Sequence, residues 1–391
     1  MRPGATTVAN GLGVIRVVVA DDSPFVCRLL TAYLESSPDI RVIAKALNGV
    51  AAVEHVQALR PDAITLDLDM PGLDGLQALE QIMHDCPIPV IMVSGVSRQA
   101  AAVTLKALEM GAVDFILKYT PGADTDPELL RQEIIAKVRA ASYIKVIRSI
   151  RTATRPQAPD LPRARSRQNT GELRSPAVVR ENSAGDENAK LPAAPAFEAA
   201  PYPPFNVIVI GASTGGPVAL RELLSHLPAD FPAAIVVVQH IPAGFTEVLA
   251  AQLDRQVPIQ VKEAAPGDRL EAGLVLIAPA DHHLLLKSNA SITLTQGPEI
   301  NGHRPSIDVT MQSIAQVCGS RTVGVVLTGM GSDGVLGLAE IRAKGGQTFA
   351  QDAATCVIDG MPRRAVERGV VDRVGSPVEI ARLLEFVPQH R

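Results

Sequence analysis

The chain has 391 residues, of which 47% are hydrophobic and 20% charged, so it can form the cores of two or three domains and is not expected to be disordered throughout. A formal net charge of −4 excludes the strongly basic balance of proteins that neutralise many phosphates, and we expect no nucleic-acid partner. The four cysteines are scattered without CxxC spacing, which fits a reducing compartment and indicates no zinc site. Apolar runs are too short to cross a bilayer, and the first residues lack the pattern of a signal peptide. We therefore expect a cytoplasmic protein without membrane insertion.

The first part of the chain alternates apolar, β-branched runs with helix-like segments. The runs cover residues 14–20, 42–46, 63–67, 89–94 and 112–117. Continuous apolar strands of this kind are typical of parallel sheets that are buried on both faces. The segment AVTLKALEMG has helical periodicity and is stopped by Gly111. We predict an α/β, flavodoxin-like domain whose functional residues lie at the carboxyl ends of its strands.

A change of composition separates this part from a second α/β part. Residues 148–204 are rich in Pro, Ala, Ser, Arg and Glu, and we interpret them as a linker with solvated charges, preceded by a helix over about 128–150. The second series of runs covers residues 207–210, 234–239, 274–278, 322–328 and 346–350, and residues 283–287 and 291–295 form a predicted hairpin. We expect domains at 14–150 and 205–388 joined by a flexible linker at 151–204, the second domain being a doubly wound, mostly parallel sheet with that antiparallel hairpin.

Acidic residues follow two strands of the first predicted sheet. Asp21 and Asp22 come after the first strand, and Asp67 ends the third. Carboxylates that converge at one sheet edge repel one another unless a hard cation binds between them, and Mg²⁺ suits such an oxygen-rich site. One carboxylate can then accept a phosphoryl group as a nucleophile. Lys118 after the fifth strand would pair with the phosphoryl oxygens, and Ser94 after the fourth would donate a hydrogen bond.

The alternative is that these are merely exposed aspartates at strand ends. The pair DD alone would favour that alternative, but DD, DLDMPGLDG, a serine and a lysine in this order and spacing do not. Residues 14–150 resemble the receiver domains of two-component response regulators. The resemblance implies that Asp67 is phosphorylated, that Asp21 and Asp22 help to hold Mg²⁺, and that the carbonyl of Asp69 adds a ligand.

The same resemblance implies which residues move on phosphorylation, and at one position this chain differs from most receivers. Phe115 lies where receivers carry the aromatic residue that moves together with Ser94 on phosphorylation. Receivers usually place a proline after the lysine, whereas Lys118 is followed by Tyr119. The sequence leaves open how this replacement affects the loop.

A serine in the second part follows the apolar run 207–210 and precedes two glycines. Small residues around Ser213 let the backbone approach a substrate, and free N–H groups at the start of a helix can hold an oxyanion. The same string, GASTGG, also fits a phosphate-binding loop. The motif alone leaves both interpretations open.

Two later residues favour acyl transfer. His240 directly follows the run 236–239, so its strand should neighbour that of Ser213, and Asp333 follows the run 322–328 within a glycine-rich turn. A serine attacks, a histidine takes its proton, and an aspartate orients the histidine and stabilises its charged form. The order Ser, His, Asp differs from that of the α/β-hydrolases.

Each of these residues also has an ordinary interpretation. A lone histidine at a strand end is more often a structural residue, and Asp333 could cap the helix that follows it. His282, His283 and His303 are rival bases, although DHHLLLK resembles the start of a hairpin and NGHRPSID a loop on the substrate side.

Longer strings now point to a family. GASTGG, QHIP, HRPSID, TGMGSDG and AQDAATCVIDGMPR closely resemble the chemotaxis response regulator protein-glutamate methylesterases, the CheB family. The resemblance implies Ser213 as nucleophile, His240 as general base, Asp333 as third triad member, and Thr214 and Met330 as contacts of the oxyanion. It also implies hydrolysis of glutamate γ-methyl esters on methyl-accepting chemoreceptors with release of methanol, deamidation of receptor glutamines, no cofactor at the esterase site, and a chemotaxis histidine kinase as phosphodonor.

A complete switch and a complete triad on one chain predict control of the hydrolase by the receiver. We expect the unphosphorylated receiver to cover the serine site, and phosphorylation of Asp67 to favour an open form. Two other classes stay open: a phosphorylation-dependent binding module that only docks receptors, and a DNA-binding response regulator. The acidic composition and the absence of a helix-turn-helix pattern after the linker disfavour the last.

Overall fold

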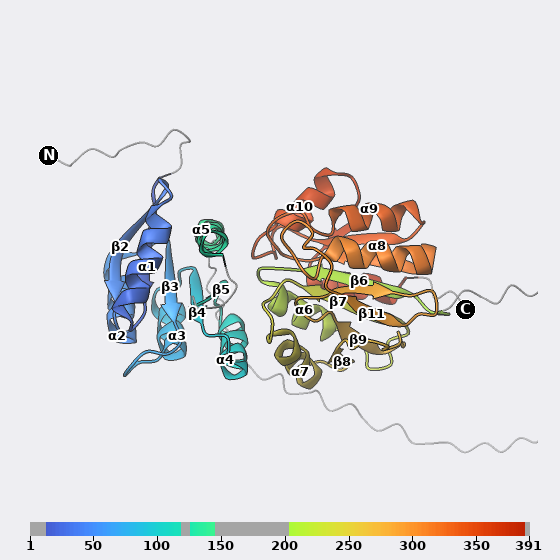
Figure 1. Ribbon diagram of the computed structural model, residues 1–391, viewed down its shortest axis with the longest axis horizontal. Helices are drawn as coiled ribbons and strands as arrows, with labels where there is room; N and C mark the ends of the chain where they lie inside the picture. Colours follow the sequence, from blue (N-terminus) through green and yellow to red (C-terminus); the bar gives the residue numbers. More distant parts are fainter. Residues whose placement is uncertain (1–12, 119–125, 145–202, 388–391) are drawn as a thin grey trace, which may run out of the picture. The chain divides into compact units, whose positions relative to one another are not determined.

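The computed structural model describes residues 13–118, 126–144 and 203–387 (Figure 1). Tyr119 and the predicted linker as far as residue 202 lie outside the described residues. Within the described ranges, no helix is both long and apolar enough to cross a membrane.

The first domain is a five-stranded parallel sheet with helices on both faces. Its strands are β1 (Ile15–Ala20), β2 (Ile40–Ala46), β3 (Ala63–Asp67), β4 (Val90–Ser94) and β5 (Asp114–Leu117), and its helices are α1 (Pro24–Glu35), α2 (Gly49–Leu59), α3 (Gly75–Asp85), α4 (Arg98–Glu109) and α5 (Pro127–Ser142). The strand order is β2-β1-β3-β4-β5. Helices α1 and α5 pack on one face and α2 to α4 on the other. This confirms the flavodoxin-like prediction and brings the carboxyl ends of β1, β3, β4 and β5 to one edge.

Local sequence explains where the helices of this domain begin. The hydroxyl of Ser97 accepts a hydrogen bond from the N–H of Ala100 at the start of α4. Asp74 and Gln77 form a reciprocal capping box at the start of α3. Such short polar side chains satisfy N–H groups that the first helical turn leaves unpaired.

The second domain is built on a seven-stranded sheet in which every neighbouring pair is parallel. Its strands are β6 (Val207–Ala212), β7 (Ala234–Gln239), β8 (Gln260–Glu263), β9 (Leu274–Ile277), β12 (Thr322–Val326), β13 (Gln347–Gln351) and β14 (Arg373–Gly375), and its order is β14-β13-β12-β6-β7-β9-β8. The helices are α6 (Gly216–Leu224), α7 (Thr246–Gln256), α8 (Ile307–Cys318), the 3₁₀ turn η1 (Gly319–Arg321), α9 (Val335–Ala343), α10 (Gly360–Glu367) and α11 (Pro377–Glu385). Helices α6, α7 and α11 cover one face and α8 to α10 the other. The central strands β6, β7 and β12 are consequently buried along their whole length.

The predicted hairpin forms a sheet of its own. Strands β10 (His283–Leu286) and β11 (Ile292–Thr295) pair with each other in an antiparallel register and not with the central sheet. Strands β8 and β14, which the sequence did not predict, form the two edges. β8 has the polar sequence QVKE and β14 has three residues, so neither carries an apolar run that would reveal a strand.

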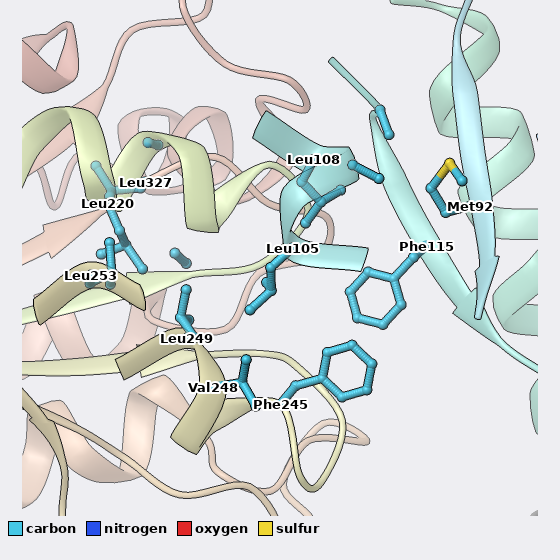
Figure 2. Close-up of a cluster of buried hydrophobic side chains, with 14 of the residues drawn as sticks. Met92, Leu105, Leu108, Phe115, Leu220, Phe245, Val248, Leu249, Leu253 and Leu327 are labelled. Atoms are coloured by element: carbon cyan, nitrogen blue, oxygen red, sulfur yellow. The ribbon is translucent and has the colours of Figure 1, made fainter. Parts of the chain in front are cut away.

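The described parts of the two domains belong to one compact unit and share a buried apolar cluster. Figure 2 shows Leu105 of α4 near Leu249 of α7, and Phe115 of β5 beside Phe245. The rings of Phe115 and Phe245 stack with their centroids 4.9 Å apart and their planes 12° apart. Because this cluster contains the receiver-type residue Phe115, the predicted switch contacts the second domain directly.

Candidate active site

Ser213 lies in the turn between β6 and α6. Its N–H donates to the carbonyl of Thr328 over 3.0 Å, and its own carbonyl accepts from the N–H of Gly216 over 2.8 Å. Gly215 has a φ of 77°, a conformation that favours glycine. The glycines that the sequence analysis singled out therefore form the tight turn that presents the serine at the carboxyl edge of the sheet.

The glycine-rich loop after β12 contacts this serine. A β-carbon built on Gly329 would lie 2.7 Å from the β-carbon of Ser213 and 2.4 Å from the sulfur of Met361. A side chain at position 329 would therefore displace Ser213 or Met361. The TGMGSDG string thus packs against the nucleophile through its backbone.

His240 follows β7, which pairs with β6 in parallel as the sequence predicts. Its N–H donates to the carbonyl of Ala212 over 2.9 Å. The side-chain amide of the buried Gln239 donates to the carbonyls of Ser213 and His240 over 2.9 and 3.0 Å. Sequence analysis overlooked Gln239, which joins the turns that carry the two reactive residues.

The imidazole of His240 pairs with Asp333. Nε2 of His240 lies 2.9 Å from Oδ2 of Asp333, and the two side chains are 7% and 1% exposed. An ionised carboxylate only accepts hydrogen bonds, so Nε2 carries the proton of this contact. Nδ1 is buried and has no hydrogen-bond partner among the described residues. The neutral ring therefore presents Nδ1 as its basic nitrogen.

Asp333 does not cap the helix that follows it in the sequence. The N-cap of α9 is Gly334, without a side-chain cap. The carboxylate instead accepts from the N–H groups of Ile307 and Asp308 over 2.7 and 3.0 Å, and from the hydroxyl of Ser306 over 3.0 Å. It therefore lies at the positive end of the dipole of α8.

These donors decide the charge of Asp333. Burial works to raise the pKa of the carboxyl, but the hydrogen bond and charge of His240 and the N–H groups of α8 outweigh burial and lower the pKa to about 2. A second carboxyl, that of Asp308, lies close by, and its burial raises its pKa to about 6. Asp333 is thus held as an anion at neutral pH, which is what orients and stabilises a charged imidazole.

The predicted oxyanion contacts are Thr214, which follows Ser213, and Met330, which follows Gly329. Within the described part of the chain, no hydrogen bond from the N–H of Thr214 or of Met330 is found. The carbonyl of Thr214 accepts from the hydroxyl of Thr328 over 2.9 Å, which holds the serine turn against the loop after β12. Met330 is 40% exposed at the same place. Unpaired N–H groups next to a nucleophile can stabilise a developing oxyanion.

The rival histidines have other surroundings. His283 is buried in β10, where Nε2 lies 3.0 Å from the carbonyl of Pro298 and Nδ1 accepts from the N–H of Ser306. His282 pairs with the carbonyl of Ala280 over 3.1 Å. His303 stacks on His240, with ring centroids 3.8 Å apart. Of these histidines, His240 alone pairs with a carboxylate next to the serine turn.

The first domain gathers its own predicted residues at the carboxyl edge of its sheet. Nζ of Lys118 lies 2.8 Å from Oδ2 of Asp67 and 3.3 Å from Oδ2 of Asp21. Oδ1 of Asp67 is buried and has no hydrogen-bond partner among the described residues. Asp21, Asp22 and Asp67 each offer an oxygen, and these oxygens lie within 4.8 Å of one another. An oxygen-rich site with an orphaned buried oxygen fits a hard divalent cation.

Burial dominates the protonation of this site. It raises the pKa of Asp67 to about 6, although Lys118 acts in the opposite direction. Burial opposes the charge of Lys118 too, but the contacts with Asp67 and Asp21 outweigh it and raise the pKa of the ammonium group. Asp67 is therefore a carboxylate of unusually high basicity beside a permanent cation.

The two predicted switch residues lie further along the same edge. The hydroxyl of Ser94 lies 2.6 Å from that of Thr104 in α4 and donates to the carbonyl of Gly95 over 3.2 Å. The ring of Phe115 packs on Phe245, and Nζ of Lys137 lies 5.3 Å from its centroid. In this structure Ser94 is thus engaged with α4 and not with Asp67.

Comparison with known proteins identifies relatives of both domains. The family model described as CheB methylesterase matches residues 208–384, and that described as response regulator receiver domain matches residues 17–130. A protein-glutamate methylesterase/protein-glutamine glutaminase from Symbiobacterium thermophilum is 44% identical over 360 residues, which cover 92% of this chain and 93% of the relative. One from Pyrococcus horikoshii is 41% identical over 363 residues, which cover 92% of this chain and 90% of the relative.

Solved structures match each domain separately. The methylesterase catalytic domain of Thermotoga maritima CheB is 43% identical and covers 46% of this chain and 97% of its own, with a TM-score of 0.45. The response regulator domain of the same organism's CheB is 41% identical and covers 34% of this chain and 99% of its own, with a TM-score of 0.31.

Proposed function

This chain belongs to the family of protein-glutamate methylesterases/protein-glutamine glutaminases, and on that premise we propose that Ser213, His240 and Asp333 hydrolyse glutamate γ-methyl esters of methyl-accepting chemoreceptors. The observation that carries the proposal is the buried pair of His240 and Asp333 beside the Ser213 turn, with Nδ1 of His240 left as a base.

In the first half of the reaction, the hydroxyl of Ser213 attacks the ester carbonyl while Nδ1 of His240 takes its proton. The negative charge that forms on the carbonyl oxygen is stabilised by the N–H groups of Thr214 and Met330. Asp333, held as an anion, stabilises the imidazolium. The imidazolium then protonates the departing methoxide, so that methanol leaves and an acyl-serine remains.

In the second half, His240 takes a proton from water, which attacks the acyl-serine. Collapse of the intermediate returns the proton to Ser213 and releases the glutamate carboxylate. The same steps on a glutamine side chain release ammonia in place of methanol. One site therefore accounts for both activities in the family's name.

We propose that Asp67 accepts a phosphoryl group from a chemotaxis histidine kinase. The oxygens of Asp21, Asp22 and Asp67 would hold Mg²⁺, which supplies charge neutralisation for the transferring phosphoryl group. Lys118 lies where it would pair with the phosphoryl oxygens. A buried carboxylate with a raised pKa is a stronger nucleophile than an exposed one.

We further propose that the unphosphorylated receiver restrains the hydrolase. The hydroxyl of Thr214, next to the nucleophile, donates to Oδ2 of Asp114 in β5 over 2.5 Å. Oδ1 of Asp114 accepts from the N–H of Phe115 over 2.8 Å and lies 3.5 Å from Nζ of Lys137. The receiver thus holds the residue that carries a predicted oxyanion donor.

Contacts around this point link phosphorylation to release. Ser94 contacts α4 through Thr104, α4 packs on α6 and α7, and Phe115 stacks on Phe245. If Ser94 turns to a phosphoryl group on Asp67, it leaves Thr104 and loosens this packing. The population then shifts towards forms in which a receptor can reach Ser213.

We place these reactions in the cytoplasm. All four cysteines are free thiols, three of them buried, which suits a reducing compartment.

The test is methanol release from methylated receptor by the wild type and by Ser213→Ala. The proposal predicts release that vanishes in the variant, with ammonia release from receptor glutamines lost in parallel. Equal release by both proteins would contradict it. Binding of receptor without any release by either protein would indicate a binding module instead.

A further inference from the structure

One histidine lies against the proposed base without belonging to the triad. The rings of His240 and His303 stack with centroids 3.8 Å apart and planes 13° apart. This is a face-to-face contact between two aromatic rings. No role is assigned to His303 in the reaction described above.

A tight turn presents this ring. Ile300 and His303 exchange both backbone hydrogen bonds, N–H of Ile300 to carbonyl of His303 over 3.1 Å and the reverse over 3.0 Å. The two residues between them, Asn301 and Gly302, have φ values of 54° and 77°. Positive φ at both central positions is the signature of a type I′ turn, for which Asn-Gly is the preferred sequence.

Neighbouring contacts hold the loop on both sides of the turn. Nη1 of Arg304 donates to the carbonyl of Gly297 over 3.0 Å. His283 links the carbonyl of Pro298 to the N–H of Ser306, the residue that also donates to Asp333. The loop that carries His303 is thus tied to the same helix start that holds the triad carboxylate.

From this geometry we propose that His303 is a positioning residue for His240. Its stacked ring holds the plane of the His240 imidazole, so that Nε2 stays on Asp333 and Nδ1 stays without a partner and free to act as the base. The face of an aromatic ring also attracts a cation, so the contact strengthens when His240 becomes an imidazolium in the transition state. This inference rests on the proposed function of the triad.

His303 suits that role because it stays neutral. Burial and, to a smaller extent, the nearby His240 lower the pKa of His303 to about 4, and together they outweigh the opposite effects of Asp333 and Glu133. A charged neighbour would repel the imidazolium, whereas a neutral ring does not. The proton that leaves Ser213 during the reaction is therefore taken up by His240 and not by His303.

The test compares three full-length variants, each activated with a small phosphodonor and Mg²⁺. His303→Leu keeps apolar bulk but has no ring, and His303→Phe keeps a ring that does not titrate. His282→Leu is the matched control, because the ring that it removes pairs with the carbonyl of Ala280 and is not part of the stack on His240. We expect kcat for methanol release to fall by about 3- to 30-fold in His303→Leu with little change in KM, because the contact acts mainly in the transition state. His303→Phe should recover most of the rate, and His282→Leu should match the wild type.

A second readout separates this inference from the choice of substrate. The rate at which a fluorophosphonate labels Ser213 reports activation of the serine by His240 without any receptor. The same order of rates is expected: wild type and His282→Leu fastest, His303→Phe close to them, His303→Leu slowest. If the wild type is labelled in this order but releases no methanol, the proposed receptor activity fails and the role of His303 stands.

Three results would overturn the inference. The first is His303→Leu with wild-type kcat and labelling rate. The second is His303→Phe as impaired as His303→Leu, which would mean that the ring contact is not what matters. The third is a wild type that is not labelled at all, because His240 would then not activate Ser213. Thermal unfolding of each variant shows whether a lost rate reflects lost folding.

Discussion

Replacement of Asp333 by asparagine tests how the triad carboxylate is held. Oδ1 accepts from the hydroxyl of Ser306 and from the N–H groups of Asp308 and Gly334, while Oδ2 accepts from Ile307 and His240. An asparagine has one oxygen and one NH₂ group. Its oxygen should take the Oδ1 position, where three donors meet, and its NH₂ group the Oδ2 position.

The substitution should lower both kcat and the stability of the fold. His240 must then accept at Nε2, so its proton moves to Nδ1 and it can no longer act as a base; a change of tautomer of this kind lowers kcat by about 10⁴-fold in serine proteases. The N–H of Ile307 faces an NH₂ group, and a buried unsatisfied donor costs about 1–3 kcal/mol. For a domain of this size we expect the midpoint of thermal unfolding to fall by about 2–12 °C.

The matched control is Ser213→Ala, which removes the nucleophile without leaving a buried donor unpaired. Methanol release and thermal unfolding of both variants give the comparison. Ser213→Ala should be inactive with an unchanged midpoint, and Asp333→Asn inactive with a lowered one. An Asp333→Asn protein with wild-type kcat, or with an unchanged midpoint, would refute the assignment of these hydrogen bonds.

Three further predictions concern the switch and the serine turn. Burial raises the pKa of Asp67 to about 6 in the metal-free protein, so its carboxylate should take up a proton as the pH falls through that value. A carboxyl-carbon NMR signal of Asp67 that does not change between pH 7 and pH 4 in metal-free protein would contradict this. Asp114→Ala removes the acceptor of the Thr214 hydroxyl, and a hydrogen bond to a charged group is worth about 1.5–3 kcal/mol. The variant should therefore release methanol about 10- to 100-fold faster than the wild type when no phosphodonor is present. Unchanged release would contradict restraint through this contact. Gly329→Ala places a β-carbon 2.7 Å from that of Ser213 and should lower kcat for methanol release by at least tenfold. Phosphorylation of Asp67, measured with a radiolabelled phosphodonor, should persist in this variant.

The serine and the acidic residues could be located from the sequence because parallel strands bring their carboxyl ends together. Asp67, Ser213 and His240 each follow or end an apolar run, and this rule alone placed them at sheet edges. The partners of Asp333 could not be predicted in this way. They come from the start of α8, whose position depends on packing between helices that periodicity does not reveal.

For His303, the sequence predicts the local turn but not the contact with His240. The dipeptide Asn301-Gly302 is a local signal for a type I′ turn and was available in the sequence. That the turn would carry His303 onto His240 depends on where the loop lies over the sheet, which no local signal encodes. The edge strands β8 and β14 were missed for the opposite reason, because their local signal is weak.

The central claim is that phosphorylation of Asp67 controls hydrolysis by Ser213. The most direct measurement is the initial rate of methanol release from methylated receptor, with and without a small phosphodonor and Mg²⁺, for the wild type and Asp67→Ala. The account predicts a rate that rises with the phosphodonor in the wild type and does not respond to it in the variant, which keeps only the basal rate. Equal stimulation of both proteins, or a wild-type rate that ignores the phosphodonor, would contradict it.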